Sequence, residues 1–321
     1  MKRLSIAASS LFAAVTVAAA QELHPGQPHA WSVQLQEALS PTEAEIHWFS
    51  NYTLWFIVPI VILVAGLLAW CVWRFNERSN PVPSRTSHNT TIEVIWTLAP
   101  VLVLVCLAIP SFQLLTKQYN PPREPELTIK ATGYQWYWGY EYQPGQTDPA
   151  ATSGAPTVGP GAGTKEATTT SAAVQPVSFE SYMLQDGDRA KAGKEDKAVY
   201  PRLLTVDNEL VVPVDTVIRI LSTSGDVIHS FAIPSMGVKI DAVPGRNNEY
   251  FFEPQKEGLF YGQCSELCGR DHAFMPIAVR VVSQEQFRAW LTAAASDLAG
   301  ANRQLTASIK AATDNVAVAG R

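Results

Sequence analysis

The stretch "NYTLWFIVPIVILVAGLLAWCVW", residues 51–73, contains no charged side chain. A second uncharged stretch follows at residues 94–115, "VIWTLAPVLVLVCLAIPSFQLL". A helix rises about 1.5 Å per residue, so about 22 helical residues reach about 33 Å, which is enough to cross the hydrocarbon core of a bilayer. A buried helical pair in a soluble protein is the alternative, and two uncharged runs of this length argue against it. The sequence therefore predicts a transmembrane helical hairpin over residues 49–118.

The distribution of basic residues predicts the orientation of this hairpin. The connecting loop carries Arg74, Arg78 and Arg85, whereas residues 21–73 contain no Lys or Arg. Because basic residues favour the cytoplasmic side of a membrane, the loop is expected inside the cell. The segment at residues 21–48 and everything after the hairpin are then expected outside.

Residues 1–20 have the pattern of a secretory signal peptide. Lys2 and Arg3 precede a short apolar run that ends in three alanines. Cleavage after Ala20 is expected, with a retained membrane anchor as the alternative. A signal peptide agrees independently with an outer location for the later part of the chain.

Composition limits the partners of the 321-residue chain. Charged residues make up 17% and hydrophobic residues 47%, and the net charge is −5. A negative chain is a poor partner for nucleic acid, so no nucleic-acid binding is expected, and a basic partner is favoured.

The region at residues 123–283 is predicted to be an all-β domain. Its apolar runs are short, rich in β-branched and aromatic residues, and separated by Pro, Gly, Asp and Asn, which is typical of a β-sandwich or barrel. The expected strands are 126–131, 134–142, 203–206, 209–213, 216–222, 230–234, 249–253, 258–263 and 276–283. Residues 144–176 are rich in Pro, Gly, Ala, Thr and Ser and are expected to form a flexible insertion.

The C-terminal part is predicted to begin with one helix, residues 284–299. Phe287, Trp290, Leu291 and Ala294 would share one face of it. Residues 300–321 show no clear apolar period and are expected to be a mobile tail.

The stretch "GQCSELCGRDHAFMP", residues 262–276, could form either a disulfide or a metal site. In an oxidising compartment, a disulfide between Cys264 and Cys268 is the ordinary expectation. Against it, His272 and Met275 lie close by in sequence. Two thiolates, an imidazole and a thioether form a soft ligand set that suits copper, whereas Met is a poor ligand for zinc.

A metal site of this kind needs a second histidine. Within residues 117–321 the only other histidine is His229, which leads into an expected strand. One Cys with two His and a Met describes a mononuclear blue-copper site, whereas two Cys can bridge two copper ions. The other cysteines, Cys71 and Cys106, lie in the spans and are interpreted as membrane-packed thiols.

Glu93 stands at the cytoplasmic start of the second span. A carboxylate in the first turn of a helix is favoured by the helix dipole, and this is the reading that the local sequence favours. The functional alternative is a proton entry group, because ionisable residues at membrane edges often mark proton routes.

Residues 45–290 resemble subunit 2 of the haem–copper cytochrome c oxidases. The resemblance rests on the two spans, the cysteine stretch and four motifs: "GYQWYWGYEY" (133–142), "VDNELVVP" (206–213), "DVIHSFAIP" (226–234) and "VKIDAVPGR" (238–246). It implies a cupredoxin-like Greek-key sandwich after the hairpin. It also implies an aerobic respiratory function, in which the subunit takes electrons from cytochrome c and passes them to haem in subunit 1. Oxygen reduction and coupled proton translocation would occur in that partner.

The resemblance also assigns roles to single residues. It implies a binuclear copper centre, CuA, bridged by the two cysteines and completed by both histidines, Met275 and the backbone carbonyl of Glu266. The Glu266 carboxylate would reach a magnesium ion shared with subunit 1. Trp136 would be the point of electron entry, and Glu93 would mark the entrance of a proton channel, which reverses the reading from its local sequence.

The expected partners follow from the same resemblance. They are subunits 1 and 3, membrane lipid and a basic cytochrome c, for which Glu141, Asp207 and Asp226 are candidate docking carboxylates. The protein would lie in a bacterial inner membrane, with its N-terminus, copper domain and C-terminus in the periplasm. Tyr134 departs from the family, which usually has His there, and the 144–176 insertion replaces a short, often acidic segment.

Two other functions are weighed against this one. A quinol oxidase subunit would use the same scaffold without copper, and loss of the Cys and His ligands would mark it. All of those residues are present here. A copper-delivery protein would need neither a two-span anchor nor the "QWYW" stretch.

Overall fold

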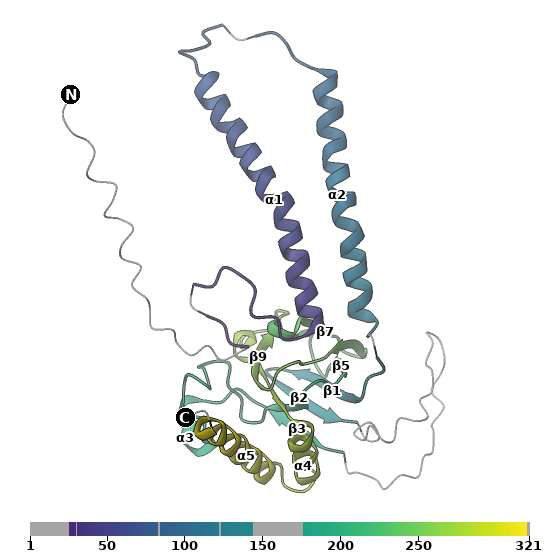
Figure 1. Ribbon diagram of the computed structural model, residues 1–321, viewed down its shortest axis with the longest axis vertical. Helices are drawn as coiled ribbons and strands as arrows, with labels where there is room; N and C mark the ends of the chain where they lie inside the picture. The colour runs from purple at the N-terminus through teal and green to yellow at the C-terminus, as the bar shows by residue number, and fades with distance from the viewer. Residues whose placement is uncertain (1–25, 30, 83, 122, 144–175, 320–321) are drawn as a thin grey trace, which may run out of the picture.

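The computed structural model describes residues 26–29, 31–82, 84–121, 123–143 and 176–319 (Figure 1). The expected signal peptide at residues 1–20 lies outside the described residues. So does the expected insertion, apart from its last residue.

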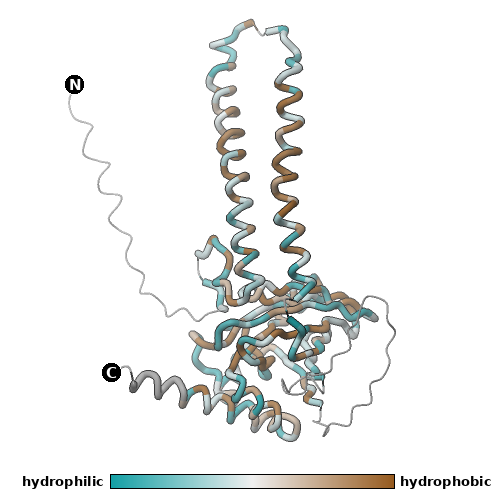
Figure 2. The backbone as a smooth tube through the Cα atoms, turned by 45° about the vertical axis from the view of Figure 1, so that its right-hand side comes forward, coloured by the Kyte–Doolittle hydropathy of each residue, from teal (hydrophilic) through white to brown (hydrophobic). Residues whose placement is uncertain are grey.

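Two long helices form the first part of the described chain. Helix α1 covers Pro41–Arg74 and helix α2 covers Thr90–Tyr119, and they stand side by side on the β domain (Figure 1). Both are long and apolar enough to cross a membrane, and hydrophobic residues occupy much of their length (Figure 2). The expected hairpin is confirmed, and α1 begins before the predicted span because Ser40 caps it, accepting a hydrogen bond from the Glu43 N–H at 3.1 Å.

The β domain is a sandwich of two five-stranded sheets. The first has the order β3 (Ser178–Ser181), β2 (Tyr137–Tyr142), β1 (Leu127–Tyr134), β5 (Ile218–Ser224) and β8 (Asn248–Phe252). The second has the order β4 (Leu210–Pro213), β10 (Pro276–Val282), β9 (Gly258–Cys264), β6 (His229–Ile233) and β7 (Val238–Ala242). Only the β1–β5 and β4–β10 pairings are parallel among the ladders of the described strands. The predicted fold class, a helical hairpin followed by a cupredoxin-like sandwich, is confirmed.

The core between the sheets is aromatic at the end that holds the cysteine stretch. Trp138 and Tyr140 alternate along β2 with outward-facing residues, and both are buried. Phe231 of β6 meets the Trp138 ring edge-on, with ring centroids 5.3 Å apart. Such contacts join the sheets and fix β6, and therefore its first residue, His229.

The segment between β3 and β4 covers the outer face of the second sheet. It contains the turn η1 (Asp186–Asp188) and the short helix α3 (Arg189–Ala192). The strand expected at residues 203–206 does not form, apart from an isolated bridge between Val206 and Met183. Tyr200 and Val206 pack instead against buried residues of β9 and β10. The apolar residues that suggested a strand here therefore cover a face of the sheet and do not form a strand of their own.

A buried ion cluster ties this segment to the sheet. The Glu209 carboxylate lies 2.8 Å from Arg280 Nε and 3.0 Å from Lys194 Nζ. Burial alone would raise the pKa of Glu209, but the charges of Arg280 and Lys194 outweigh that effect and lower the pKa to about 2.

Two helices follow the sandwich. Helix α4 covers Gln284–Ala294, and its predicted apolar face is buried, with the Trp290 ring 5.4 Å from that of Tyr142. Helix α5 covers Leu298–Ala319, where a mobile tail without an apolar period was expected. That prediction is wrong over the first turns of α5, because Ala301 and Leu305 are buried against the domain.

Candidate metal centre

The cysteine stretch forms the loop between β9 and β10. Its ends are closed by a hydrogen bond from the Cys264 N–H to the Met275 carbonyl, at 3.1 Å. The loop is also tied to β6, since the Ser265 N–H donates to the Ser230 carbonyl at 3.0 Å. These bonds follow from the pairing of β6 with β9, in which Phe231 stands opposite Cys264. His229 is thereby brought beside a loop that lies far from it in sequence.

Two glycines allow the surrounding backbones to approach. Gly269 has a φ of +121°, and a Cβ there would lie 3.0 Å from Gln135 Nε2 and 3.2 Å from a ring carbon of Trp136. Gly133 passes over the imidazole of His229, where a Cβ would lie 2.8 Å from the ring. A larger residue at Gly269 would push the loop away from the turn after β1, and one at Gly133 would push β1 away from β6.

Sulfur and nitrogen atoms converge inside this loop. The Sγ atoms of Cys264 and Cys268 are 3.8 Å apart, and neither cysteine forms a disulfide. Cys264 Sγ lies 3.8 Å from His229 Nδ1, and Cys268 Sγ lies 3.6 Å from His272 Nδ1. Donor atoms spaced about 3.3–3.8 Å apart are what a tetrahedral metal ion with bonds of about 2.0–2.3 Å requires.

The remaining expected ligands, Glu266 and Met275, belong to the same loop. The backbone carbonyl of Glu266 accepts from Cys264 Sγ at 3.3 Å, so this oxygen faces the sulfur atoms. Met275 is almost fully buried at the end of the loop. The carboxylate-bearing side chain of Glu266 is exposed. The donor set therefore fits a soft metal such as copper, with a hard oxygen group beside it.

The two thiols differ in acidity. Burial raises the pKa of Cys264, but hydrogen bonds from His229 and from backbone groups lower it overall to about 6. Burial and the negative charge on Cys264 raise the pKa of Cys268 to about 12. One proton leaves readily and the second is held until a cation displaces it, so metal binding is expected to release protons here.

Asp226 fixes the orientation of His229. Its Oδ1 lies 2.8 Å from His229 Nε2, and its Oδ2 accepts from the Gln135 N–H at 2.8 Å. Since Nε2 is engaged, Nδ1 faces Cys264. A carboxylate behind a ligating histidine holds the ring and its tautomer. Asp226 was expected at a docking surface, and its contact with His229 was not predicted. The sequence did offer one signal for this contact, because Asp226 stands only three residues before His229.

Trp136 contacts the cysteine loop directly. Its Nε1 donates to the Cys268 carbonyl at 3.3 Å, and the Gln135 side chain donates to the same oxygen at 2.8 Å. The guanidinium carbon of Arg270 lies 5.4 Å from the centroid of the indole ring. The structure therefore joins the half-buried Trp136 to the loop through a single peptide group.

The other expected site residues are not gathered at the centre. Glu141 is exposed on β2, and Asp207 accepts hydrogen bonds from the backbone N–H groups of Tyr182 and Asn208. Glu93 lies in the first turn of α2, on a helix end away from the β domain (Figure 1), and accepts from the Asn89 N–H at 3.2 Å. This is the contact of a reciprocal helix cap.

Comparison with known proteins gives consistent matches along the chain. Residues 127–282 match the family model for the periplasmic domain of cytochrome c oxidase subunit II, and residues 28–114 match its transmembrane domain. A probable cytochrome c oxidase subunit 2 of Rickettsia felis is 44% identical over 265 residues, which cover 83% of this chain and 72% of the relative. The cytochrome c oxidase subunit 2 of Cereibacter sphaeroides is 39% identical over 297 residues, 88% of each chain.

Among solved structures, the periplasmic domain of subunit II of cytochrome oxidase (CoxB) of Bradyrhizobium japonicum is 46% identical. The match covers 54% of this chain and 95% of that domain, with a TM-score of 0.39.

Proposed function

This chain belongs to the cytochrome c oxidase subunit II family, the CuA-containing electron-entry subunits of haem–copper oxidases, and we propose that it takes electrons from cytochrome c at Trp136. It is a membrane protein and part of an oxidoreductase complex. Its single most informative feature is the convergence of two thiols and two imidazoles within 3.6–3.8 Å contacts.

The copper ligands proposed for this chain are the residues of the metal centre. They are Cys264 and Cys268 through sulfur, the two histidines through Nδ1, Met275 through its thioether and Glu266 through its carbonyl. When bound, the copper pair supplies a centre that gains and loses one electron with little rearrangement. The protein keeps both cysteines, His229 and Met275 buried, and the loop closure, the Asp226 contact and the aromatic core hold them in place.

Electron entry is assigned to Trp136. The indole is half-buried, and its Nε1 is bonded to the carbonyl of Cys268, which is itself a proposed ligand. An electron donor that contacts the indole is thus connected to the metal centre through the hydrogen bond from Trp136 Nε1 to the Cys268 carbonyl and through Cys268 itself. The haem-bearing subunit 1 would receive the electron from the centre.

Magnesium is proposed to bind at the Glu266 carboxylate. The side chain is exposed beside the metal loop, and a carboxylate oxygen is a ligand that Mg²⁺ prefers. One such group does not make a complete site, so the other ligands would come from subunit 1 and water. The carbonyl and the carboxylate of one residue would then serve two different metals.

The remaining parts of the proposal concern the membrane. The arginine-bearing loop between α1 and α2 is proposed to face the cytoplasm of a bacterium and the β domain the periplasm, with the inner membrane between them. Glu93 would then stand at the cytoplasmic edge as the entrance of a proton route. Subunit 3 is proposed as a further partner in the same complex.

A copper count on the purified oxidase complex tests the proposed centre. We expect two copper ions assigned to this subunit, with the absorption and paramagnetic resonance of a mixed-valence pair. The Cys268→Ser variant should lose that signal while the complex still assembles. One copper ion or none in this subunit, with its thiols free, would refute the proposal.

A further inference from the structure

The turn between β5 and β6, residues 225–228, leads directly into His229. All four of its residues are exposed, so none of their side chains anchors the turn in the core of the sandwich. A segment without buried side chains moves unless other contacts hold it. The Asp226 carboxylate, which orients the His229 ring, lies in this turn, and its place therefore depends on the contacts that fix the turn.

Hydrogen bonds fix the local shape of this turn. Ser224 Oγ accepts from the Asp226 N–H at 3.1 Å and donates to the Val227 carbonyl. The Gly225 N–H donates to the Gly133 carbonyl at 3.0 Å, which joins the start of the turn to the end of β1. These bonds define the shape of the turn, and its first residue receives a further contact, from a side chain of β1.

That side chain is Tyr134, whose ring lies directly against Gly225. A Cβ at Gly225 would lie 2.3 Å from Tyr134 Cε1 and 2.8 Å from Cδ1, which is too short for any real contact. The other edge of the ring faces β2, where a Cβ at Gly139 would lie 3.3 Å from Cε2. The ring therefore lies between two backbone segments that come close to it only because they carry no side chain there.

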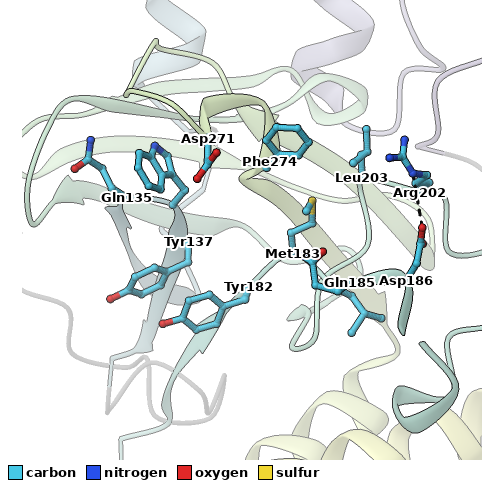
Figure 3. Close-up of a pocket in the computed structure, with 12 residues that line it drawn as sticks. Gln135, Tyr137, Tyr182, Met183, Gln185, Asp186, Arg202, Leu203, Asp271 and Phe274 are labelled. Carbon is cyan, nitrogen blue, oxygen red and sulfur yellow. Dashed lines mark ion pairs between the residues drawn. The ribbon is translucent and has the colours of Figure 1, made fainter. Parts of the chain in front are cut away.

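The Tyr134 ring is itself held in place. It stacks on the ring of Tyr137, its partner in the β1–β2 register, with centroids 4.9 Å apart and an interplanar angle of 14°. The Tyr137 ring in turn stacks on that of Tyr182 at 4.4 Å, and these two rings lie side by side in Figure 3. Stacked rings attract one another beyond the effect of burial. The ring is thus a fixed surface against which the backbone of Gly225 packs.

We propose that Tyr134 is a positioning residue of the metal centre. Its ring fixes the backbone of Gly225, the turn then sets the place of the Asp226 carboxylate, and that carboxylate orients the His229 ring through the 2.8 Å contact with Nε2. This inference rests on the proposed function, because His229 is one of the proposed copper ligands. Residues that orient a ligand from behind affect how tightly the metal is held and its electronic structure.

Two variants of the copper-loaded oxidase complex test the role of the ring. Tyr134→Ala removes it, and we expect the complex to retain copper against a chelator about three- to tenfold less well than the wild type. The histidine nitrogen hyperfine coupling in its paramagnetic resonance spectrum should change as well. Tyr134→Phe keeps the ring and should show wild-type copper retention and coupling. Wild-type values in Tyr134→Ala would overturn the inference, and so would equal changes in the two variants.

Gly225→Ala tests the same contact from the other side. The φ of Gly225 is not positive, so its backbone accepts Ala, and the three atoms nearest to the added Cβ all belong to the Tyr134 ring. Gly225→Ala alone should change the histidine coupling. Added to Tyr134→Ala it should cause little further change, because the ring is already gone. Changes that simply add would show that the ring and the turn act independently and would overturn the inference.

Gly187→Ala is the matched control. Gly187 also lacks a positive φ, and a Cβ there would meet nothing within 4 Å, so this variant should keep the wild-type coupling. A change as large as that in Gly225→Ala would assign the effect to a general loss of order and overturn the inference. The wild-type complex separates the two proposals. If it holds no copper pair, the proposed function fails, whereas a copper pair that Tyr134→Ala leaves unchanged refutes only the role of Tyr134.

Discussion

His229 Nε2 lies 2.8 Å from Asp226 Oδ1, and the other oxygen of that carboxylate accepts from the Gln135 backbone at 2.8 Å. Asp226 therefore connects a proposed copper ligand to the turn that carries Trp136. The metal centre and the point of electron entry share one side chain, so their geometries are expected to change together.

Replacing Asp226 should disturb copper binding. Asp226→Ala removes the partner of His229, and losses of about 10- to 100-fold in metal affinity are typical of such changes. Asp226→Asn keeps an oxygen that can accept from the imidazole, so its copper affinity should be closer to that of the wild type. Copper titration followed by absorption measures both variants. Equal wild-type affinity and an unchanged spectrum in Asp226→Ala would show that His229 does not need this contact.

Replacing Gly269 should displace the electron-entry tryptophan. A Cβ at this position meets the Gln135 side chain and the Trp136 ring, so Gly269→Ala is expected to slow copper reduction by cytochrome c about tenfold or more. Stopped-flow measurement of that reduction tests the effect.

Gly245 supplies the matched control for this variant. It also has a positive φ, +74°, but a Cβ there would meet nothing within 4 Å. Gly245→Ala should therefore cost only about 1 kcal/mol of stability from backbone strain. Equal slowing in both variants would mean that backbone strain, and not contact with Trp136, limits the rate.

The ion cluster of Glu209 predicts an acid-sensitive step in unfolding. Its pKa is about 2 in the folded protein, against an ordinary value of 4.5, so the stabilisation is fully present above the ordinary value. It is lost as the pH falls from about 4.5 through about 2, because the unfolded chain takes up the proton first. Chemical denaturation of the purified chain at several pH values measures this dependence.

Two variants distinguish the contribution of Glu209 to the acid sensitivity from that of the other carboxylates. Glu209→Gln should flatten the stability profile between pH 2 and 4.5, because this side chain no longer takes up a proton. Arg280→Met should cost about 3–5 kcal/mol near neutral pH, since it leaves Glu209 buried with one cation fewer. A Glu209→Gln profile parallel to that of the wild type would assign the acid sensitivity to other groups.

The sequence predicted which side chains gather at the candidate site better than it predicted their surroundings. The cysteine loop is local in sequence, so Cys264, Cys268, His272 and Met275 could be proposed from their spacing, whereas Glu266 was named only through the family resemblance. His229 could be named because the outer domain holds few histidines, and the β6–β9 pairing brings it to the loop. The contacts of Asp226 could not be predicted, because they depend on how the turns after β1 and β5 meet.

The same reason explains what was missed elsewhere. The pocket drawn in Figure 3 is lined by segments near residues 136, 183, 203 and 274, which only the fold brings together. Helix α5 was overlooked because its buried contacts come partly from small residues. Ala301 adds little apolar signal, and Asn302 is held by a hydrogen bond from Trp290 Nε1, at 2.9 Å, rather than by hydrophobicity.

Glu93 offers a test that separates its two possible roles. The carboxylate accepts from the Asn89 N–H in the cap of α2, at 3.2 Å. An amide oxygen can accept the same hydrogen bond but cannot carry a proton at neutral pH. Glu93→Gln therefore keeps the cap and removes the proton carrier, whereas Glu93→Ala removes both.

If Glu93 is the entrance of a proton route, both variants should slow turnover of the oxidase complex to a similar extent, with the copper spectrum unchanged. If it serves only as a cap, Glu93→Gln should turn over like the wild type. Glu93→Ala should then lose about 0.5–2 kcal/mol of helix stability, the usual cost of a missing cap. Turnover measured by oxygen uptake, together with proton release from vesicles, distinguishes these outcomes, and wild-type rates in Glu93→Gln would refute the proton role.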